Sequence, residues 1–204
     1  LAENGAHVVI AEIIEENARE TAKLVEDLGR RAMTVTVDVT DQSSVDRLIP
    51  EVLGQFDQVD ILINNAGVIG ASGWEQRERS AEEDWDLAFE VNVKGVARVT
   101  DAIAPHMKER KYGKIVNIAS VAARQGSPLN PSYNASKAAV VNLTQAQSLE
   151  LAHYDINVNA ICPSHVSSQM NTSFHNRLAM TVEVSKGMSG REAFENSVRE
   201  RVPL

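Results

Sequence analysis

Short apolar runs alternate with longer amphipathic segments along the whole chain. The runs are rich in Val and Ile, which is typical of buried parallel strands, and they cover residues 7–11, 32–37, 59–64, 114–119 and 156–161. Apolar residues recur with helical spacing in the segments between and after them, at 15–28, 43–56, 91–108, 132–152 and 189–199, with a further helix from residue 80. This alternation predicts an α/β fold, a doubly wound parallel sheet with helices on both faces.

Two of the predicted helices begin with a capping-box sequence. Ser80 is followed three residues later by Glu83, and Ser189 is followed in the same way by Glu192. In this motif the serine hydroxyl and the carboxylate each accept a backbone N–H of the first turn. We therefore expect helices to begin at these two serines.

The pattern indicates one domain. The chain has 204 residues and 43% hydrophobic content, and no repeat or linker interrupts it, so a single domain over residues 1–204 is expected. Residues 1–5 resemble the last turn of a helix with a glycine stop, and residues 202–204 carry no closing signal. We therefore expect the chain to be truncated at both ends.

Charge and composition argue against several classes of partner. The net charge is −8 and Lys and Arg do not cluster, so neither nucleic acid nor a membrane surface is expected as a partner. The single cysteine, Cys162, suits a reducing, cytoplasmic location, and its apolar neighbours predict a buried strand end. His106 and His165 have no second ligand at metal spacing, so no metal site is predicted.

Candidate functional residues gather at the carboxyl ends of the predicted strands. Five strands are ended or followed by such residues: Glu12, Asp38, the segment 64–67, Ser120 and Pro163. In open parallel sheets, ligands bind in the crevice beyond these ends. The sequence therefore predicts one ligand site to which several strands contribute.

Tyr133 and Lys137 are the centre of this candidate site. They lie four residues apart on a predicted helix, so their side chains share a face, and Ser120 lies thirteen residues before the tyrosine. A cation beside the phenol lowers the pKa of the tyrosine, and a serine hydroxyl can donate to a carbonyl oxygen as charge grows on it. These are the parts of a proton-transfer site for an alcohol or ketone, although the spacing alone also fits an ordinary helix with a solvated lysine.

Acidic residues follow the first two strands. Glu12 can accept hydrogen bonds from ribose hydroxyls and repels a 2′-phosphate, which favours NAD over NADP; it also fits a surface glutamate. Asp38 can bond an adenine amino group while Val39 packs near the ring, or it can cap the helix that follows. The two interpretations of Asp38 stay open.

Small and amide residues mark further positions. In the segment 64–67, Asn-Asn-Ala-Gly, small side chains allow a ligand to approach the backbone, and the amides can tie neighbouring strands together. Asn92 and Gly95 weaken a predicted helix, and an interruption there would free a carbonyl to bind a water. The segment 163–168 follows the last strand, where it can bond a nicotinamide amide.

The chain resembles the classical short-chain dehydrogenases/reductases over essentially all of its length. The resemblance rests on motifs in the family's order and spacing, namely 64–67, Asn92, Ser120, Tyr133 and Lys137. It implies a Rossmann-type fold and an enzyme that transfers hydride between a nicotinamide cofactor and a secondary alcohol or ketone.

The resemblance also implies roles for these residues. Tyr133 would be the general acid/base, and Lys137 would bind the nicotinamide ribose and lower the pKa of Tyr133. Ser120 would hold the substrate oxygen, and Asn92 would anchor a water that relays protons. The cofactor, NAD rather than NADP, would contact Glu12, Asp38, Val39, Asn65, Ala66, Gly67, Tyr133, Lys137, Pro163, Val166 and Ser168.

The implied partners are a small molecule and further copies of the chain. The family commonly assembles through two long helices, here 91–108 and 132–152, so a dimer or tetramer is expected. The substrate is expected between the segments 125–131 and 168–199, whose residues fit a polyol, a sugar, a small ketone or a 3-oxoacyl group equally well.

The chain departs from the family pattern in three ways. The first strand and the glycine-rich phosphate turn are absent, which would leave a gap about two strand spacings wide between strands 7–11 and 59–64. Ser164 and Ser168 stand where glycine and threonine are usual, and the final strand is absent. The absent phosphate turn and Ser164 motivate an alternative, a non-catalytic binding or assembly module. A lyase or epimerase that uses the Tyr-Lys pair is a third interpretation.

Overall fold

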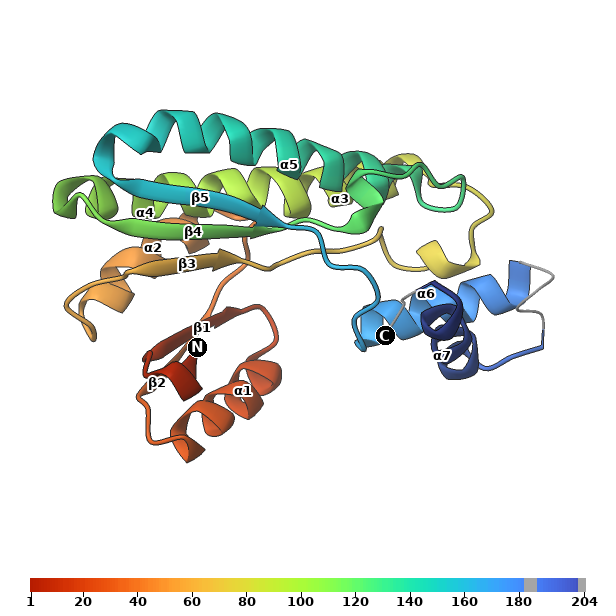
Figure 1. Cartoon of the computed structure of the whole chain (residues 1–204), viewed down its shortest axis with the longest axis horizontal. Coiled ribbons are helices and arrows are strands. Elements are labelled where there is room, and N and C mark those ends of the chain that lie inside the picture. The colour runs from red at the N-terminus through yellow and green to blue at the C-terminus, as the bar shows by residue number, and fades with distance from the viewer. Residues whose placement is uncertain (182–186, 202–204) are drawn as a thin grey trace.

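The computed structural model describes residues 1–181 and 187–201, and its described part is an α/β fold, as predicted (Figure 1). Every predicted strand forms within two residues of its expected bounds. The strands are β1 (Val8–Glu12), β2 (Ala32–Thr36), β3 (Ile61–Asn64), β4 (Gly113–Ile118) and β5 (Ile156–Ile161). All of the pairings between them are parallel.

Helices connect these strands and follow the last one. Their bounds are α1 (Glu15–Asp27), α2 (Gln42–Leu53), α3 (Glu82–Phe89), α4 (Val96–Arg110), α5 (Pro131–Leu151), α6 (Gln169–Thr181) and α7 (Gly190–Arg201). Short turns add η1 (Ala2–Asn4), η2 (Trp74–Gln76), η4 (Val121–Ala123), η5 (Ala152–Tyr154) and a π-helical segment, η3 (Glu90–Gly95). No helix in the described ranges is long and apolar enough to cross a membrane.

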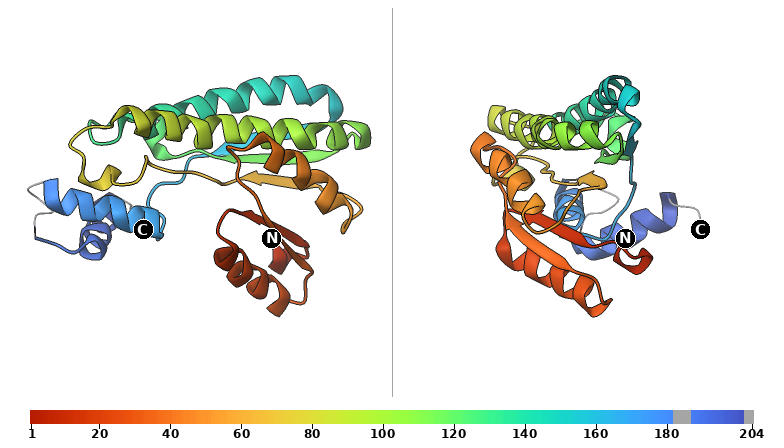
Figure 2. Two further views of the ribbon diagram at one scale, coloured as in Figure 1. Left: turned by 180° about the vertical axis from the view of Figure 1, so that it is seen from behind. Right: turned by 90° about the vertical axis from the view of Figure 1, so that its left-hand side faces the viewer.

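The strands form two sheets rather than one. β1 pairs with β2, and β4 lies between β3 and β5; within the described residues, no ladder joins β1 to β3. Figure 2 shows the unit of β1, β2 and α1 set apart from the larger sheet. The sheet is thus divided between strands 7–11 and 59–64, where the sequence predicts a gap, and the α/β fold class is confirmed.

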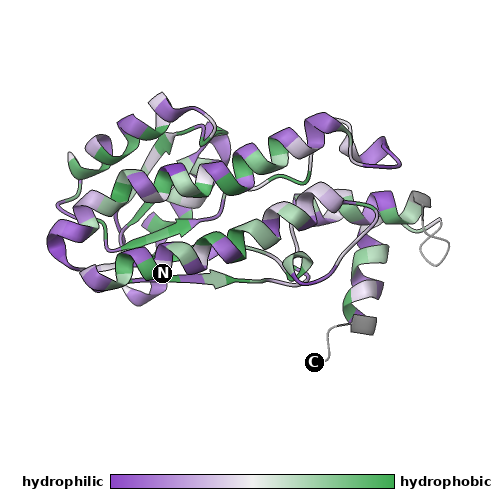
Figure 3. Ribbon diagram, turned by 90° about the horizontal axis from the view of Figure 1, so that it is seen from above, coloured by the Kyte–Doolittle hydropathy of each residue, from purple (hydrophilic) through white to green (hydrophobic). Residues whose placement is uncertain are grey.

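The core lies between the larger sheet and the helices on one of its faces. α4 and α5 run along β3, β4 and β5, with Met107, Ile115 and Ile156 fully buried between them. A second buried cluster links the two sheets and contains Leu48 and five valines from β2, the residue after it, α2 and α4, of which Val45 is fully buried. Figure 3 shows the hydrophobic strands and the mixed surfaces of the helices.

Several apolar residues of the larger sheet are open to solvent. Ile61 and Ile63 on β3 are 40% and 42% exposed, and Ile161 at the end of β5 is 51% exposed. Cys162, which follows Ile161, is also exposed, so the prediction that it is buried is wrong. The physical reason is that α4 and α5 cover one face of this sheet, whereas these residues lie away from that cover.

The two predicted capping boxes have different outcomes. Ser189 and Glu192 bond each other's backbone N–H at 3.3 and 2.8 Å, and α7 begins at the next residue, which confirms this box. At α3 the N-cap is Ala81, whose N–H donates to Asp84 rather than to Glu83. The Ser80 hydroxyl pairs instead with the hydroxyl of Ser132, so the first box is wrong by one residue.

Candidate active site

Tyr133 and Lys137 lie in the first two turns of α5. Pro131 takes the first position of the helix, where its missing N–H costs nothing and its fixed φ suits a helix start. The two side chains share a face as predicted, with the Lys137 Nζ atom 5.8 Å from the centre of the Tyr133 ring. The helix thus presents both groups toward the carboxyl end of β4, where Ser120 lies.

Lys137 is a buried cation held by a backbone carbonyl. Its residue is 5% exposed, and Nζ donates a 2.7 Å hydrogen bond to the carbonyl of Ile118, the last residue of β4. Removal from water disfavours the charged form and lowers the pKa of Lys137 from 10.5 to about 8. The lysine can therefore change its charge close to neutral pH.

Burial affects the pKa of the Tyr133 phenol more than its neighbouring groups do. Burial raises the pKa of Tyr133 above 10.0, and a hydrogen bond with Ser120 partly opposes that rise. The prediction that Lys137 lowers this pKa is not met in this structure. The ammonium lies 5.8 Å from the ring centre and is hydrogen-bonded to Ile118, so loss of solvent dominates.

Ser120 is fixed by the turn that follows β4. It caps η4, and its Oγ atom accepts a 3.1 Å hydrogen bond from the N–H of Ala122. The next residue, Val121, donates its N–H to the carbonyl of Pro163 at 2.9 Å. This bond continues the pairing of β4 with β5 and brings Pro163, a predicted cofactor contact, beside the serine.

Asn92 lies in η3, where the helix is interrupted as its sequence predicts. Its Oδ1 atom accepts from the N–H of Val68 at 2.8 Å, and its Nδ2 atom donates to the Val68 carbonyl and to Ser136 Oγ, both at 2.9 Å. Ser136, which the sequence interpretation missed, lies one residue before Lys137 and donates to the carbonyl of Tyr133. Asn92 therefore ties the loop after β3 to the helix that carries Tyr133.

Gly67 lies against two of these side chains. A Cβ atom on this glycine would stand 3.3 Å from both Asn92 Oδ1 and Lys137 Nζ, so the position has little room for a larger residue. Asn65 and Ala66, which precede it, are exposed at the end of β3. The segment 64–67 thus reaches the same edge of the sheet as the tyrosine and lysine.

Asn64 begins that segment and ties two strands together, as predicted. Its Nδ2 atom donates to Asn117 Oδ1 at 2.8 Å, and the two residues are register partners in β3 and β4. Asn117 is fully buried and donates to Thr144 and Gln147 of α5 at 2.9 and 3.0 Å. This polar network fixes α5 on the sheet directly behind the candidate site.

Glu12, Asp38 and Val39 lie at the ends of β1 and β2. Glu12 accepts the N–H groups of the two residues that follow it, at 3.0 and 3.1 Å. Asp38 accepts from Thr40, and the cap of α2 is Asp41, so the interpretation of Asp38 as a helix cap is wrong. The assignment of Asp38 to adenine binding stays a prediction.

The remaining predicted cofactor contacts lie between β5 and α6. Val166 is 53% exposed, and its carbonyl accepts a 2.9 Å hydrogen bond from Asn171. Ser168 Oγ accepts from the N–H of Asn171 at 3.2 Å, which is the geometry of a helix cap. Both residues therefore set the start of α6, and their contacts with a nicotinamide stay predictions.

The geometry suits proton transfer to or from a bound oxygen. A half-buried phenol, a serine hydroxyl bonded to it and a cation of lowered pKa meet at one sheet edge. Such a group can protonate an oxygen while the serine stabilises the charge on it.

Comparisons with known proteins identify relatives over most of the chain. A sequence profile described as short chain dehydrogenase matches residues 1–179. The sorbitol dehydrogenase of Cereibacter sphaeroides is 41% identical over 81% of this chain, which spans 62% of that protein.

Solved structures of dehydrogenases also match this chain over most of its length. The structure of an NAD⁺-bound xylitol dehydrogenase matches with a TM-score of 0.78 and 30% identity, covering 86% of this chain and 68% of that one. A gluconate 5-dehydrogenase from Burkholderia cenocepacia J2315, in complex with NADP and tartrate, matches with a TM-score of 0.76 and 32% identity, covering 91% and 69%.

Proposed function

The chain belongs to the short chain dehydrogenase family, and on this basis we propose that it transfers hydride between a nicotinamide cofactor and a secondary alcohol or ketone. The observation that carries the proposal is the meeting of Tyr133, Ser120 and Lys137 at the carboxyl end of β4. A sheet edge of this kind is where open α/β proteins bind their ligands.

Each of the three side chains has one task in the proposed reaction. Tyr133 exchanges a proton with the substrate oxygen, and the Ser120 hydroxyl donates to the same oxygen. Lys137, whose Nζ atom lies 5.8 Å from the centre of the Tyr133 ring, binds the nicotinamide ribose. Asn92 holds the loop after β3 against α5, and its π-helical backbone is the proposed anchor for a proton-relaying water.

The residues around Lys137 fit a nicotinamide nucleotide. The ammonium has three N–H donors, one of which bonds Ile118, and donors of this kind suit ribose hydroxyls. Gly67 and the exposed Asn65 and Ala66 let a ligand approach the backbone at the end of β3. When bound, the cofactor supplies or accepts the hydride.

NAD is the proposed cofactor, in preference to NADP. The support is Glu12, an acidic residue at the end of β1, whose carboxylate repels a 2′-phosphate. We also propose a cytoplasmic protein that assembles as a dimer or tetramer through α4 and α5. Sedimentation analysis tests that assembly, because a monomer at micromolar concentration would contradict it.

Turnover of a substrate panel tests the proposed function. The protein is mixed with NAD⁺ and polyols, sugars or secondary alcohols, or with NADH and small ketones or 3-oxoacyl thioesters, while NADH absorbance is followed. Change in absorbance with at least one pair supports the proposal. Saturable NADH binding without turnover on any pair would favour the non-catalytic alternative.

A further inference from the structure

Arg177 of α6 is a buried cation that connects three separate segments. The residue is 2% exposed, and its Nη1 atom donates a 2.7 Å hydrogen bond to Asn130 Oδ1. Its Nη2 atom donates to the backbone carbonyl of Arg77, and the guanidinium lies 5.7 Å from the ring centre of Trp74. A charge removed from water needs such partners, so this position selects an arginine rather than an apolar residue.

Asn130, the partner of Arg177, is the N-cap residue of the helix that carries Tyr133. An N-cap asparagine usually bonds an N–H of its own first turn, but the Asn130 side chain makes no such bond. Its oxygen faces Arg177 instead, while its backbone carbonyl accepts the N–H of Asn134 at 3.0 Å. The start of α5, three residues before Tyr133, is therefore tied to α6 rather than capped from within.

The second partner, the Arg77 carbonyl, belongs to a loop that is itself fixed. The Arg77 side chain bonds Asp84 Oδ1 at 2.5 Å and the carbonyl of Ser72 at 2.9 Å. Asp84 is buried and also accepts the N–H groups of Ala71 and Ala81, each at 2.8 Å. Arg177 thus joins α6 to a rigid loop on one side and to the active-site helix on the other.

α6 also begins at the candidate cofactor segment, because Ser168 caps it. A shift of α6 would therefore displace residues 163–168 and, through Asn130, the start of α5. Arg177 itself is enclosed and bonded to protein oxygens, so contact with substrate is not its role.

We propose that Arg177 is a positioning residue that couples the docking of α6 to the orientation of Tyr133. The inference rests on the proposed function for its catalytic consequence, but the coupling between Arg177 and Asn130 is physical and is measured without turnover. Loss of the guanidinium frees the start of α5, and displacement of a catalytic group by about 1 Å can cost about 100-fold in rate.

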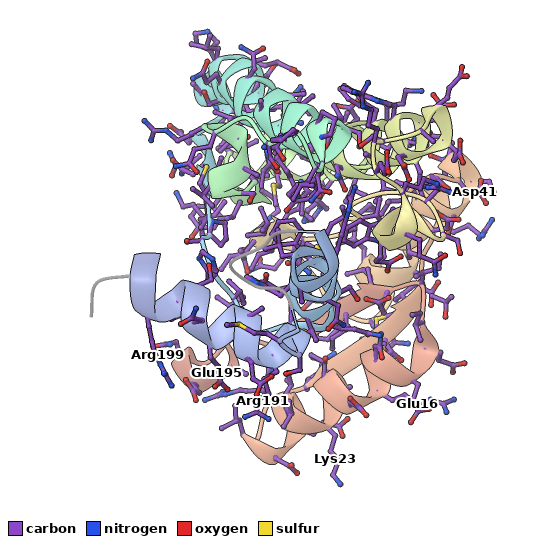
Figure 4. All side chains as sticks on the ribbon, turned by 90° about the vertical axis from the view of Figure 1, so that its right-hand side faces the viewer. Glu16, Lys23, Asp41, Arg191, Glu195 and Arg199 are labelled. Carbon is purple, nitrogen blue, oxygen red and sulfur yellow. The ribbon has the colours of Figure 1, made fainter. Side chains whose placement is uncertain are left out.

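The test compares wild type with Arg177→Ala, Arg177→Lys, Asn130→Ala and Asn130→Asp. Arg191→Ala is the matched control, because Arg191 on α7 is exposed and, among the described residues, pairs with Glu195 one turn away (Figure 4). Amide hydrogen exchange is measured in peptides covering 131–137 and 169–181, together with kcat, KM and the Kd for NADH.

Arg177→Ala and Asn130→Ala should each raise exchange in both segments and lower kcat about tenfold or more, while the NADH Kd changes less than about twofold. Arg177→Lys should recover only part of kcat, because one ammonium nitrogen replaces the two guanidinium nitrogens that bond the separate oxygens of Asn130 and Arg77. Asn130→Asp should recover most of kcat, because its carboxylate can still accept from the guanidinium. The double alanine variant should be little worse than Arg177→Ala alone, since that change already removes the bond to Asn130.

Faster exchange confined to 169–181, with unchanged exchange in 131–137 and unchanged kcat, would overturn the proposal. If Arg177→Ala does not fold, Asn130→Ala applies the same test from the other end of the bond. If wild type turns over no substrate, the proposed function fails, while the exchange data still decide whether Arg177 positions α5.

Discussion

Lys137 Nζ donates a 2.7 Å hydrogen bond to the carbonyl of Ile118, and this bond joins the active-site helix to the end of β4. The lysine is therefore both a tether and a buried charge. Ser120 lies two residues beyond Ile118, so the bond also fixes the distance between the helix and the serine. Because Lys137 is buried and can carry a charge, the free energy of unfolding depends on pH.

The pKa of Lys137 predicts that stability rises between about pH 8 and pH 10.5. Burial lowers this pKa from 10.5 to about 8, so in that window the unfolded chain binds more protons than the folded one. Below about pH 8 both states carry the charge and the full desolvation penalty applies. Above 10.5 both are neutral and the penalty is gone.

Urea unfolding of wild type and Lys137→Met from pH 7 to pH 10.5 measures this effect. The free energy of unfolding of wild type, relative to that of Lys137→Met, should rise by up to about 3 kcal/mol between about pH 8 and pH 10.5. Lys23→Met, at an exposed position on α1, is the control and should show no such trend. A Lys137→Met difference that is flat with pH would show that the lysine is not desolvated.

Gly95 is expected to tolerate no side chain. A Cβ atom there would stand 2.8 Å from Val39 Cγ2, closer than ordinary packing allows. Gly95→Ala should therefore lower the free energy of unfolding by about 1–2 kcal/mol, although alanine is the better helix former. Thermal and urea unfolding measure the loss.

Two variants control the Gly95 prediction. Val39→Ala should rescue much of the loss in the double variant, because it removes the clashing methyl groups. Gly126→Ala should change stability by less than about 0.5 kcal/mol, because a Cβ atom there meets nothing within 4 Å. Equal losses with and without Val39 would rule out the proposed clash.

Asn117→Ala should be strongly destabilising. The fully buried amide bonds Asn64, Thr144 and Gln147, and its removal takes one hydrogen bond from each of these buried groups. We expect a loss of about 3 kcal/mol in urea unfolding. Asn159→Ala, on the exposed side of β5, should cost less than about 0.5 kcal/mol, and similar losses at both positions would contradict the network.

Glu12→Ser should change the preference between the two cofactors. Removal of the carboxylate relieves repulsion of a 2′-phosphate and removes an acceptor for ribose hydroxyls. The ratio of kcat/KM for NAD to that for NADP should fall about tenfold or more, corresponding to about 1.4 kcal/mol. Glu16→Ser, in the first turn of α1, is the control (Figure 4). An unchanged ratio in Glu12→Ser would remove the basis for preferring NAD.

The sequence predicted the elements and the convergence of residues at one sheet edge. Parallel strands must end at the same edge, so Ser120 after β4 and the segment 64–67 after β3 were expected to meet Tyr133. Helical spacing placed Lys137 on the same face as Tyr133. These relationships follow from local periodicity and from topology, which can both be inferred from a sequence.

Other features depend on distances and burial that no local pattern records. The raised pKa of Tyr133 reflects loss of solvent that outweighs the hydrogen bond with Ser120, and only coordinates weigh those two effects. The exposure of Cys162 depends on which face of the sheet the helices cover. Arg177 gave no signal in the sequence, because its partner Asn130 is 47 residues distant.

Comparison of wild type with Tyr133→Phe tests the central claim most directly. The two are compared for turnover of the best substrate in the panel and for NADH binding by nicotinamide fluorescence. Loss of nearly all turnover with an NADH Kd within about twofold of wild type is the expected result, because only the proton-transferring hydroxyl is removed. Retention of most of the wild-type kcat by Tyr133→Phe would contradict the assignment of the acid/base.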